Sequence, residues 1–147
     1  MENGLAVTKK RNYRIIDHTA DVGIEVYGGD LSELMEHAGE ALFSIITDIE
    51  YVETSVSHNI TVAPGENEEV LRNWLEQLLQ YFNTDDMLFS RFEVILADDG
   101  FFRCTAAGEK IDSDRHLFHT EIKGITYHQF EVSGDESGWQ ARIILDV

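Results

Sequence analysis

Two aspartates occupy positions where carboxylates could hold a cation together. Asp21 stands at the start of a predicted strand, and Asp146 stands on the last predicted strand, one residue before Val147. If the first and last strands pair, the two side-chain carboxylates and the terminal carboxylate of Val147 would meet. Clustered hard oxygens repel one another unless a proton or a cation lies between them. The pattern therefore allows a Ca²⁺ or Mg²⁺ site, and the alternative interpretation is two exposed carboxylates at strand ends.

Three further residues have side chains that could take part in chemistry. His116 and His119 have a spacing that could bind zinc, but no cysteine or further ordered ligand accompanies them, so a polar loop is the favoured interpretation. Lys123 stands at the start of a predicted strand in a very acidic chain. Its ordinary role would be a surface charge that balances Glu121 or another neighbour.

Two other residues are assigned to the interior of the protein. Cys104 has no neighbourhood typical of a reactive or metal-binding cysteine, and we interpret it as a small core residue. His58 alternates with apolar residues on a strand, and we interpret it as a partly buried histidine. The chain also has no Walker loop and no GxGxxG, GxSxG, CxxC or HExxH pattern.

The elements that must position these residues follow from the hydrophobic periodicity. Apolar residues recur at helical spacing over residues 31–47 and again over residues 70–82, so both segments are predicted helices. Asp30 followed by Glu33 predicts a capping box at the start of the first helix. Short runs in which apolar and polar residues alternate, bounded by turn residues, predict strands over residues 13–16, 22–27, 56–62, 92–97, 101–106, 121–132 and 139–147. We predict an α+β fold, with two helices packed on one face of a mixed, largely antiparallel β-sheet.

Length and composition fit one domain. The chain has 147 residues, 43% of them hydrophobic, which suits a single domain over residues 13–147 after a flexible basic tail over residues 1–12. No apolar run approaches the roughly 18–20 residues that span a bilayer, and the first residues do not resemble a signal peptide. The single cysteine cannot form an internal disulfide, so we expect a cytoplasmic protein.

The charge is strongly negative and unevenly distributed. The formal net charge is −17, and no Lys or Arg lies between Arg14 and Arg72, a stretch that holds 13 Asp and Glu. A surface that grips nucleic-acid phosphates needs clustered basic residues, so this class of function is disfavoured. We interpret most of the carboxylates as a solubilising surface. The alternative is that a few of them converge on a bound cation or on a basic partner.

Three segments together resemble the archease family. They are DHTADVGI (Asp17–Ile24), KGITYH (Lys123–His128) and IILDV (Ile143–Val147). The segments LSELMEHAGEALFSIITD and LRNWLEQLLQYF look like the two helices of that family, and the likeness covers residues 13–147. Gly124 departs from the family pattern, which more often has Ala there.

This resemblance implies a function. Archeases are not known as enzymes on their own but as activators of the GTP-dependent RNA ligase of the RtcB type, which acts in tRNA splicing and RNA repair. They promote guanylylation of the ligase and allow multiple turnovers. The metal-binding aspartates of the family match Asp21 and Asp146, and the carboxylate of Val147 is a further expected ligand. The essential lysine of the family matches Lys123, which is expected to contact the partner.

The resemblance also sets the expected cofactor and partners. The cofactor would be a divalent cation, with Ca²⁺ ahead of Mg²⁺ or Mn²⁺. The partner would be the RtcB-type RNA ligase, and association with tRNA would run through that ligase. We expect no strong direct binding to nucleic acid and no membrane association.

Two other classes of function stay open. A general chaperone, or an adaptor for nucleic-acid-modifying proteins, would expose a sizeable apolar patch, and a chaperone would suppress aggregation of unrelated clients. A small metal-dependent hydrolase using Asp21 and Asp146 is disfavoured, because no general base or nucleophile accompanies the two aspartates.

Overall fold

The computed structural model describes residues 12–17 and 21–147. Nearly all of the predicted basic tail, residues 1–12, therefore lies outside the described residues. The elements follow in the order β1 (Tyr13–Asp17), β2 (Asp21–Gly28), α2 (Leu31–Ile46), the 3₁₀ turn η1 (Ile49–Tyr51), β3 (Val56–Val62), α3 (Asn67–Asp85), β4 (Met87–Leu96), β5 (Phe102–Lys110), β6 (Gly124–Asp135) and β7 (Gly138–Asp146). None of the helices in these residues is long and apolar enough to cross a membrane.

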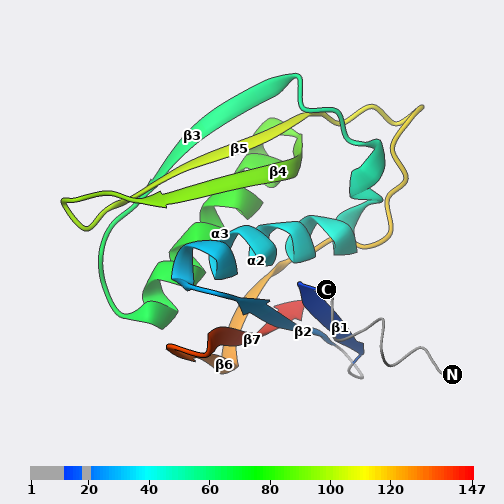
Figure 1. Ribbon diagram of the computed structural model, residues 1–147. Coiled ribbons are helices and arrows are strands. Elements are labelled where there is room, and N and C mark those ends of the chain that lie inside the picture. Colours follow the sequence, from blue (N-terminus) through cyan, green and yellow to red (C-terminus); the bar gives the residue numbers. More distant parts are fainter. Residues whose placement is uncertain (1–11, 18–20) are drawn as a thin grey trace, which may run out of the picture.

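The strands form two antiparallel sheets with the helices between them (Figure 1). One sheet has the strand order β1-β2-β7-β6, and the other has the order β3-β5-β4. Helix α2 contacts both β2 and β4, so it packs against both sheets, while α3 packs against β6, β3 and β4. The predicted α+β class with two helices is confirmed, and the strands divide between two sheets where the sequence analysis placed them in one.

The width of the apolar stripe on α2 explains the second sheet. Nine of the 16 residues of this helix are buried, so the helix needs cover on more than one side. Gly39 on α2 lies directly under the ring of Phe92 from β4, because a Cβ added to Gly39 would come 2.9 Å from that ring. The absence of a side chain at Gly39 therefore lets the second sheet approach the helix closely.

Acidic side chains cap the N-terminus of both helices. At α2, the N–H of Glu33 donates to the Asp30 carboxylate at 2.8 Å, and the Glu33 carboxylate accepts from the N–H of Gly29 at 2.6 Å. At α3, Glu66 and Glu69 form a reciprocal capping box. These bonds satisfy N–H groups that have no partner inside the first turn. The predicted start of the first helix is confirmed, and its end lies one residue earlier than predicted.

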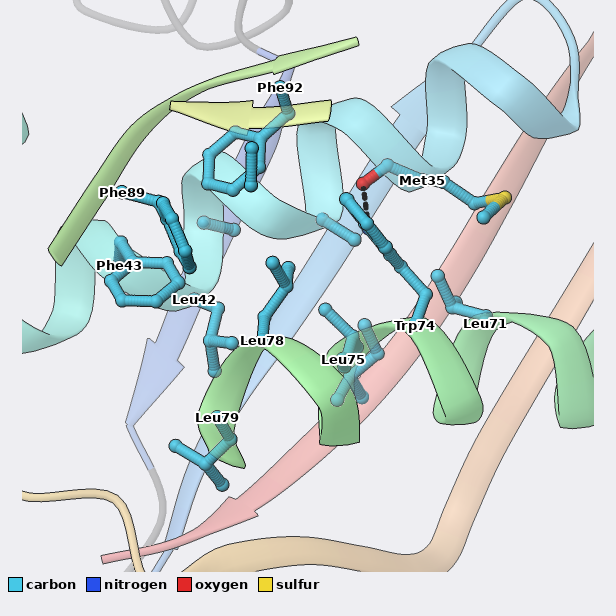
Figure 2. Packing of buried hydrophobic residues seen from close by; sticks show 14 of the residues in the cluster. Met35, Leu42, Phe43, Leu71, Trp74, Leu75, Leu78, Leu79, Phe89 and Phe92 are labelled. Carbon is cyan, nitrogen blue, oxygen red and sulfur yellow. Dashed lines mark hydrogen bonds between the residues drawn. The ribbon is translucent and has the colours of Figure 1, made fainter. Parts of the chain in front are cut away.

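The core lies around the two helices and takes residues from both sheets. The indole N–H of Trp74 on α3 donates to the backbone carbonyl of Met35 on α2 at 2.7 Å, and Figure 2 shows this bond among the packed side chains. The ring of Phe43 meets that of Phe89 edge-on, with centroids 5.6 Å apart. The Trp74 bond gives a fully buried polar group its partner and fixes the two helices against each other.

Carboxylates on the helices satisfy donors on strands at the sheet edges. The N–H of Val94 on β4 donates to Glu36 on α2 at 2.8 Å, and the N–H of Val132 on β6 lies 3.4 Å from a carboxylate oxygen of Glu68 on α3. Both β4 and β6 are edge strands. An open edge exposes unpaired N–H groups that attract other strands, so these contacts protect the edges.

Residues 111–123, here called the crossing segment, connect β5 in one sheet to β6 in the other. The segment runs past the C-terminal end of α2, at the right of Figure 1. The hydroxyl of Thr47 donates to the carbonyl of Leu117 at 2.5 Å, and the N–H of His119 donates to the carbonyl of Ile46 at 2.9 Å. These bonds fix the path that the chain takes towards Lys123.

Candidate metal centre

Asp21 and Asp146 lie directly opposite each other on neighbouring strands. Asp21 is the first residue of β2, Asp146 is the last residue of β7, and the two are register partners in the antiparallel ladder. Directly opposed residues place their side chains on the same face of the sheet, with Cβ atoms about 4.5–5.5 Å apart. The condition of the prediction, that the two strands pair, is therefore met, and the role of the two carboxylates as metal ligands stays a prediction.

This face of the sheet is the one turned away from the helices. Ala141, Ile143 and Leu145 of β7 are buried in the core, so Asp146 points to the opposite side. Ile144 shares that side with Asp146 and is nevertheless buried. Asp146 itself is exposed, and Asp21 is half-buried. The two carboxylates thus stand at the end of a partly covered face and remain accessible.

The strand on the other side of Asp146 leaves space beside it. Gly124, the first residue of β6, is the register partner of Asp146, and a Cβ added there would meet nothing within 4 Å. Thr126 lies two residues further along β6, opposite Ile144. Its hydroxyl is buried and has no hydrogen-bond partner among the described residues. Two carboxylates beside open space, with an oxygen donor nearby, suit a hard cation such as Ca²⁺ or Mg²⁺.

The described side chains alone would leave such a cation with few ligands. Over residues 12–17 and 21–147, no three His, Cys, Asp or Glu side chains come together as a metal-binding group. Ca²⁺ takes about six to eight oxygen ligands, so water, other oxygens of the chain or a partner would have to complete the shell. Val147, the further predicted ligand, packs its side chain against the core.

Lys123 is bonded to Asp146 through its backbone. Its N–H donates to the carbonyl of Asp146 at 2.7 Å, which ties the end of the crossing segment to the end of β7. Ile122 is buried next to it, whereas the Lys123 side chain is exposed and forms no ion pair within the part of the chain that the structure describes. The alternative role of balancing Glu121 is not seen.

The two histidines of the proposed polar loop anchor the crossing segment. The N–H of Asp112 donates to Nδ1 of His116 at 2.9 Å, which leaves Nε2 as the protonated nitrogen that donates to Glu109 at 3.0 Å. Nε2 of His119 lies 2.7 Å from the Asp48 carboxylate. Both rings thus have carboxylate partners, which agrees with the interpretation of a polar loop over that of a zinc site.

Glu109 is the centre of this anchor. It is largely buried and accepts hydrogen bonds from the N–H of Glu53, from His116 and from Arg115. Burial opposes ionisation of this carboxyl, but these hydrogen bonds and the charge of Arg115 outweigh it and lower its pKa. The sequence analysis missed this residue, because only the fold brings positions 53, 109 and 116 together.

The residues assigned to the interior behave as predicted. Cys104 is 3% exposed, and burial, with a further contribution from the charge of Glu36, raises the pKa of its thiol to about 12. The thiol therefore stays protonated near neutral pH and is a poor nucleophile. His58 is half-buried and packs its ring against Tyr81, with centroids 4.6 Å apart.

The outer face of the same sheet carries a second polar cluster. The Glu25 carboxylate is 2.7 Å from Arg14, 3.2 Å from Arg142 and 3.0 Å from the hydroxyl of Tyr27. Burial alone would raise the pKa of the Glu25 carboxyl. The three hydrogen-bond partners outweigh burial and lower this pKa below its ordinary value, so the carboxylate is ionised and paired. This cluster joins β1, β2 and β7 on the same face as Asp21 and Asp146.

Comparison with known proteins identifies the family of this chain. Residues 13–147 match the model of the archease protein family. The archease of Methanopyrus kandleri is 38% identical over 135 residues, which cover 90% of this chain and 96% of the relative.

The chain belongs to the archease family.

Other archeases agree in sequence and in fold. That of Pyrococcus furiosus is 35% identical, and the match covers 93% of this chain and 99% of the relative. The solution structure of a Methanobacterium thermoautotrophicum protein is similar with a TM-score of 0.81 and 34% identity, over 92% of this chain and 99% of that chain. The crystal structure of an archease from Thermotoga maritima has a TM-score of 0.64 and 18% identity, over 91% and 96% of the two chains, so it supports the fold alone.

Proposed function

We propose that this protein activates an RtcB-type RNA ligase through a divalent cation held at Asp21 and Asp146. The observation that carries the proposal is the direct pairing of these two aspartates across β2 and β7. The ligase is the partner that the resemblance of the sequence motifs implies, and membership of the archease family supports the proposal. In this proposal the protein catalyses no reaction of its own but acts on the ligase.

Each residue of the centre has a stated task. Asp21 and Asp146 would hold the cation, which supplies concentrated positive charge next to the phosphates handled by the ligase. Val147 stays a prediction as a third ligand. Lys123 is exposed beside Asp146, so its ammonium is free to form a charge-assisted contact with a carboxylate or phosphate of the complex. The net charge of −17 would attract a basic ligase surface.

The test is a multiple-turnover RNA ligation assay with a cognate ligase. We expect Asp21→Ala and Asp146→Ala each to abolish the stimulation that the wild-type protein gives, because each removes half of the side-chain ligands. Asp98→Ala is the matched control, since Asp98 is an exposed aspartate in the turn between β4 and β5. Circular dichroism would verify that all three variants fold.

Titration calorimetry separates the metal from the activation. Wild type should bind Ca²⁺, Mg²⁺ or Mn²⁺, alone or with the ligase, and both aspartate variants should lose that binding. If both variants stimulate the ligase as wild type does, the proposed centre has no role in activation. If wild type gives no stimulation, the proposed partner is wrong.

A general chaperone is the second candidate that was kept open. The Thermotoga maritima structure is described as a possible chaperone. The large apolar side chains that are exposed here belong to five different parts of the chain: β1, η1, β3, β4 and the crossing segment. Suppression of aggregation of an unrelated client such as citrate synthase by the wild-type protein would favour this candidate over a dedicated activator.

A further inference from the structure

A cavity of about 440 Å³ opens where the C-terminal end of α3 meets the crossing segment. Phe82, Ile111 and Phe118 supply its apolar lining, and Asp86 and Glu121 add two carboxylates. The rings of Phe82 and Phe118 lie 6.0 Å apart at an angle of 50°. We call this the Phe118 cavity. No lysine or arginine is among the described residues that line it.

The apolar side of the cavity is exposed on a fixed backbone. Phe118 is 50% exposed and the adjacent Leu117 is 64% exposed. Their backbone is nevertheless fixed at two points near the end of α2. The carbonyl of Leu117 accepts from Thr47, and the N–H of His119 donates to the carbonyl of Ile46. An exposed aromatic side chain on an anchored segment loses little conformational freedom on binding, which is a property of residues that dominate protein interfaces.

The end of α3 carries charges that disfavour the folded state. Asp86 caps the helix at φ 55°, a left-handed conformation where Gly or Asn is usual, and the last turn has no basic residue. The C-terminus of a helix is the negative end of its dipole, so a carboxylate there is unfavourable and a cation is favourable. Neither the Asp86 nor the Glu121 carboxylate has a hydrogen-bond or ion-pair partner in residues 12–17 and 21–147.

We propose that the Phe118 cavity receives a lysine or arginine side chain of a protein partner. The aliphatic stem of that side chain would lie on the rings of Phe82 and Phe118, and its charged end would meet Asp86 and Glu121. The cation would also neutralise the negative end of α3. The net charge of the chain, −17, attracts a partner with a basic surface.

The cavity and the candidate metal centre lie on one segment. Phe118 and Lys123 are five residues apart, so their Cα atoms are separated by at most about 18 Å. One partner surface can therefore contact both. The identification of that partner as the RNA ligase rests on the proposed function, whereas the chemistry of the cavity does not depend on it.

Asp86→Asn is the most informative variant. Asparagine tolerates the left-handed conformation and removes the charge, so we expect the urea midpoint of this variant to rise while its affinity for the ligase falls. Phe118→Ala should weaken binding by about five-fold or more. The double variant Asp86→Asn with Glu121→Gln should also bind with a shallower dependence on salt concentration.

Leu96→Ala and Glu93→Gln are the matched controls for these binding measurements. Leu96 is 57% exposed and Glu93 is exposed, and both lie on β4, outside the cavity. Both controls should bind as wild type does. If the Phe118 and Asp86 variants also bind as wild type does, the cavity does not receive the partner, even when the aspartates of the metal centre prove essential.

A second measurement tests the cavity without the ligase. The full-length protein would be titrated with millimolar Nα-acetyl-lysine amide and with its norleucine analogue, which lacks the amine, while amide resonances are followed by NMR. We expect lysine to shift the resonances of Asp86, Phe118 and Glu121 more than norleucine does. Equal or absent shifts would overturn the proposal. If the wild-type protein does not bind the ligase but responds to lysine more than to norleucine, the proposed function is wrong and the proposal for the cavity is supported.

Discussion

Among the single residues, Gly124 matters for the side chain that it lacks. It lies directly beside Asp146 at the edge of the candidate metal centre, and the space where its Cβ would be is open. Its φ angle is not in the positive range, unlike those of Gly100 and Gly138. A small side chain such as that of Ala, which the resemblance to archeases implies at this position, therefore fits there without strain.

Gly124→Ala should stabilise the fold slightly. Because the native backbone suits alanine, the substitution mainly lowers the entropy of the unfolded chain, by about 0.4–1 kcal/mol. Urea unfolding followed by circular dichroism would measure the change. Gly138→Ala is the control, since Gly138 has φ 148° and should lose more than about 1 kcal/mol. A clear loss of stability in Gly124→Ala would show that the space beside Asp146 is not open.

At the scale of elements, the crossing segment decides where Lys123 lies. It has no regular secondary structure over most of its length, so its position depends on the anchor formed by Glu109, Arg115 and His116. The same segment ends with the Lys123 N–H bonded to β7. Loosening the anchor would therefore loosen both the Phe118 cavity and the residue next to the metal centre.

Glu109→Gln should destabilise the protein by roughly 1–3 kcal/mol at pH 7, because it weakens charge-assisted hydrogen bonds in a largely buried place. The pKa of Glu109 is lowered by folding, so its contribution to stability is complete above its ordinary pKa of about 4.5. It is lost as the pH falls through the lower pKa of the folded state. The difference between wild type and variant should thus shrink below about pH 4.5.

Urea titrations at pH 7 and below pH 4 would measure this difference. Glu93→Gln serves as a control at pH 7, where the substitution of this exposed carboxylate should change stability by less than about 0.5 kcal/mol. A gap between Glu109→Gln and wild type that stays constant over the whole pH range would exclude the assigned role of the Glu109 charge.

At the scale of the whole molecule, the charge of −17 acts on stability as well as on binding. Like charges on a compact chain repel one another, and the repulsion is weaker in the expanded unfolded state. The ion pairs that involve arginine are mostly exposed and contribute little in return. The acidity therefore favours solubility and attraction of a basic partner at some cost in stability.

Added NaCl should stabilise the free protein. Raising the ionic strength from about 0.01 to 0.15 M shortens the screening length from about 30 to 8 Å and weakens the repulsion. We expect a gain of about 1 kcal/mol, which for a chain of this size corresponds to about 2–4 °C in Tm. Calorimetry in the presence of a chelator would exclude an effect of bound divalent ions. A Tm that falls with salt would show that ion pairs outweigh the repulsion.

The sequence by itself determined the local elements. Helical and alternating periodicity placed α2 and α3 to within three residues at each end, because side-chain spacing within one element reports directly on its buried face. The strands predicted over residues 92–97 and 101–106 were too short, since β4 begins five residues earlier and β5 ends four residues later. For β6, the strand was predicted over residues 121–132 and is observed at Gly124–Asp135. The register between β6 and β7 also shifts between Thr126 and Glu131. Such an irregularity depends on packing across strands and leaves no periodic pattern.

The candidate metal centre divides in the same way. The residue types and the likeness to archeases singled out Asp21, Asp146 and Lys123, but sequence spacing could not show that positions 21 and 146 are opposite each other. Only the tertiary structure decided that β2 pairs with β7, that two sheets enclose the helices, and that Phe82, Phe118 and Asp86 share a cavity. The physical reason is that pairing between distant strands is selected by burial of the whole core, a property of the folded chain and of no single segment.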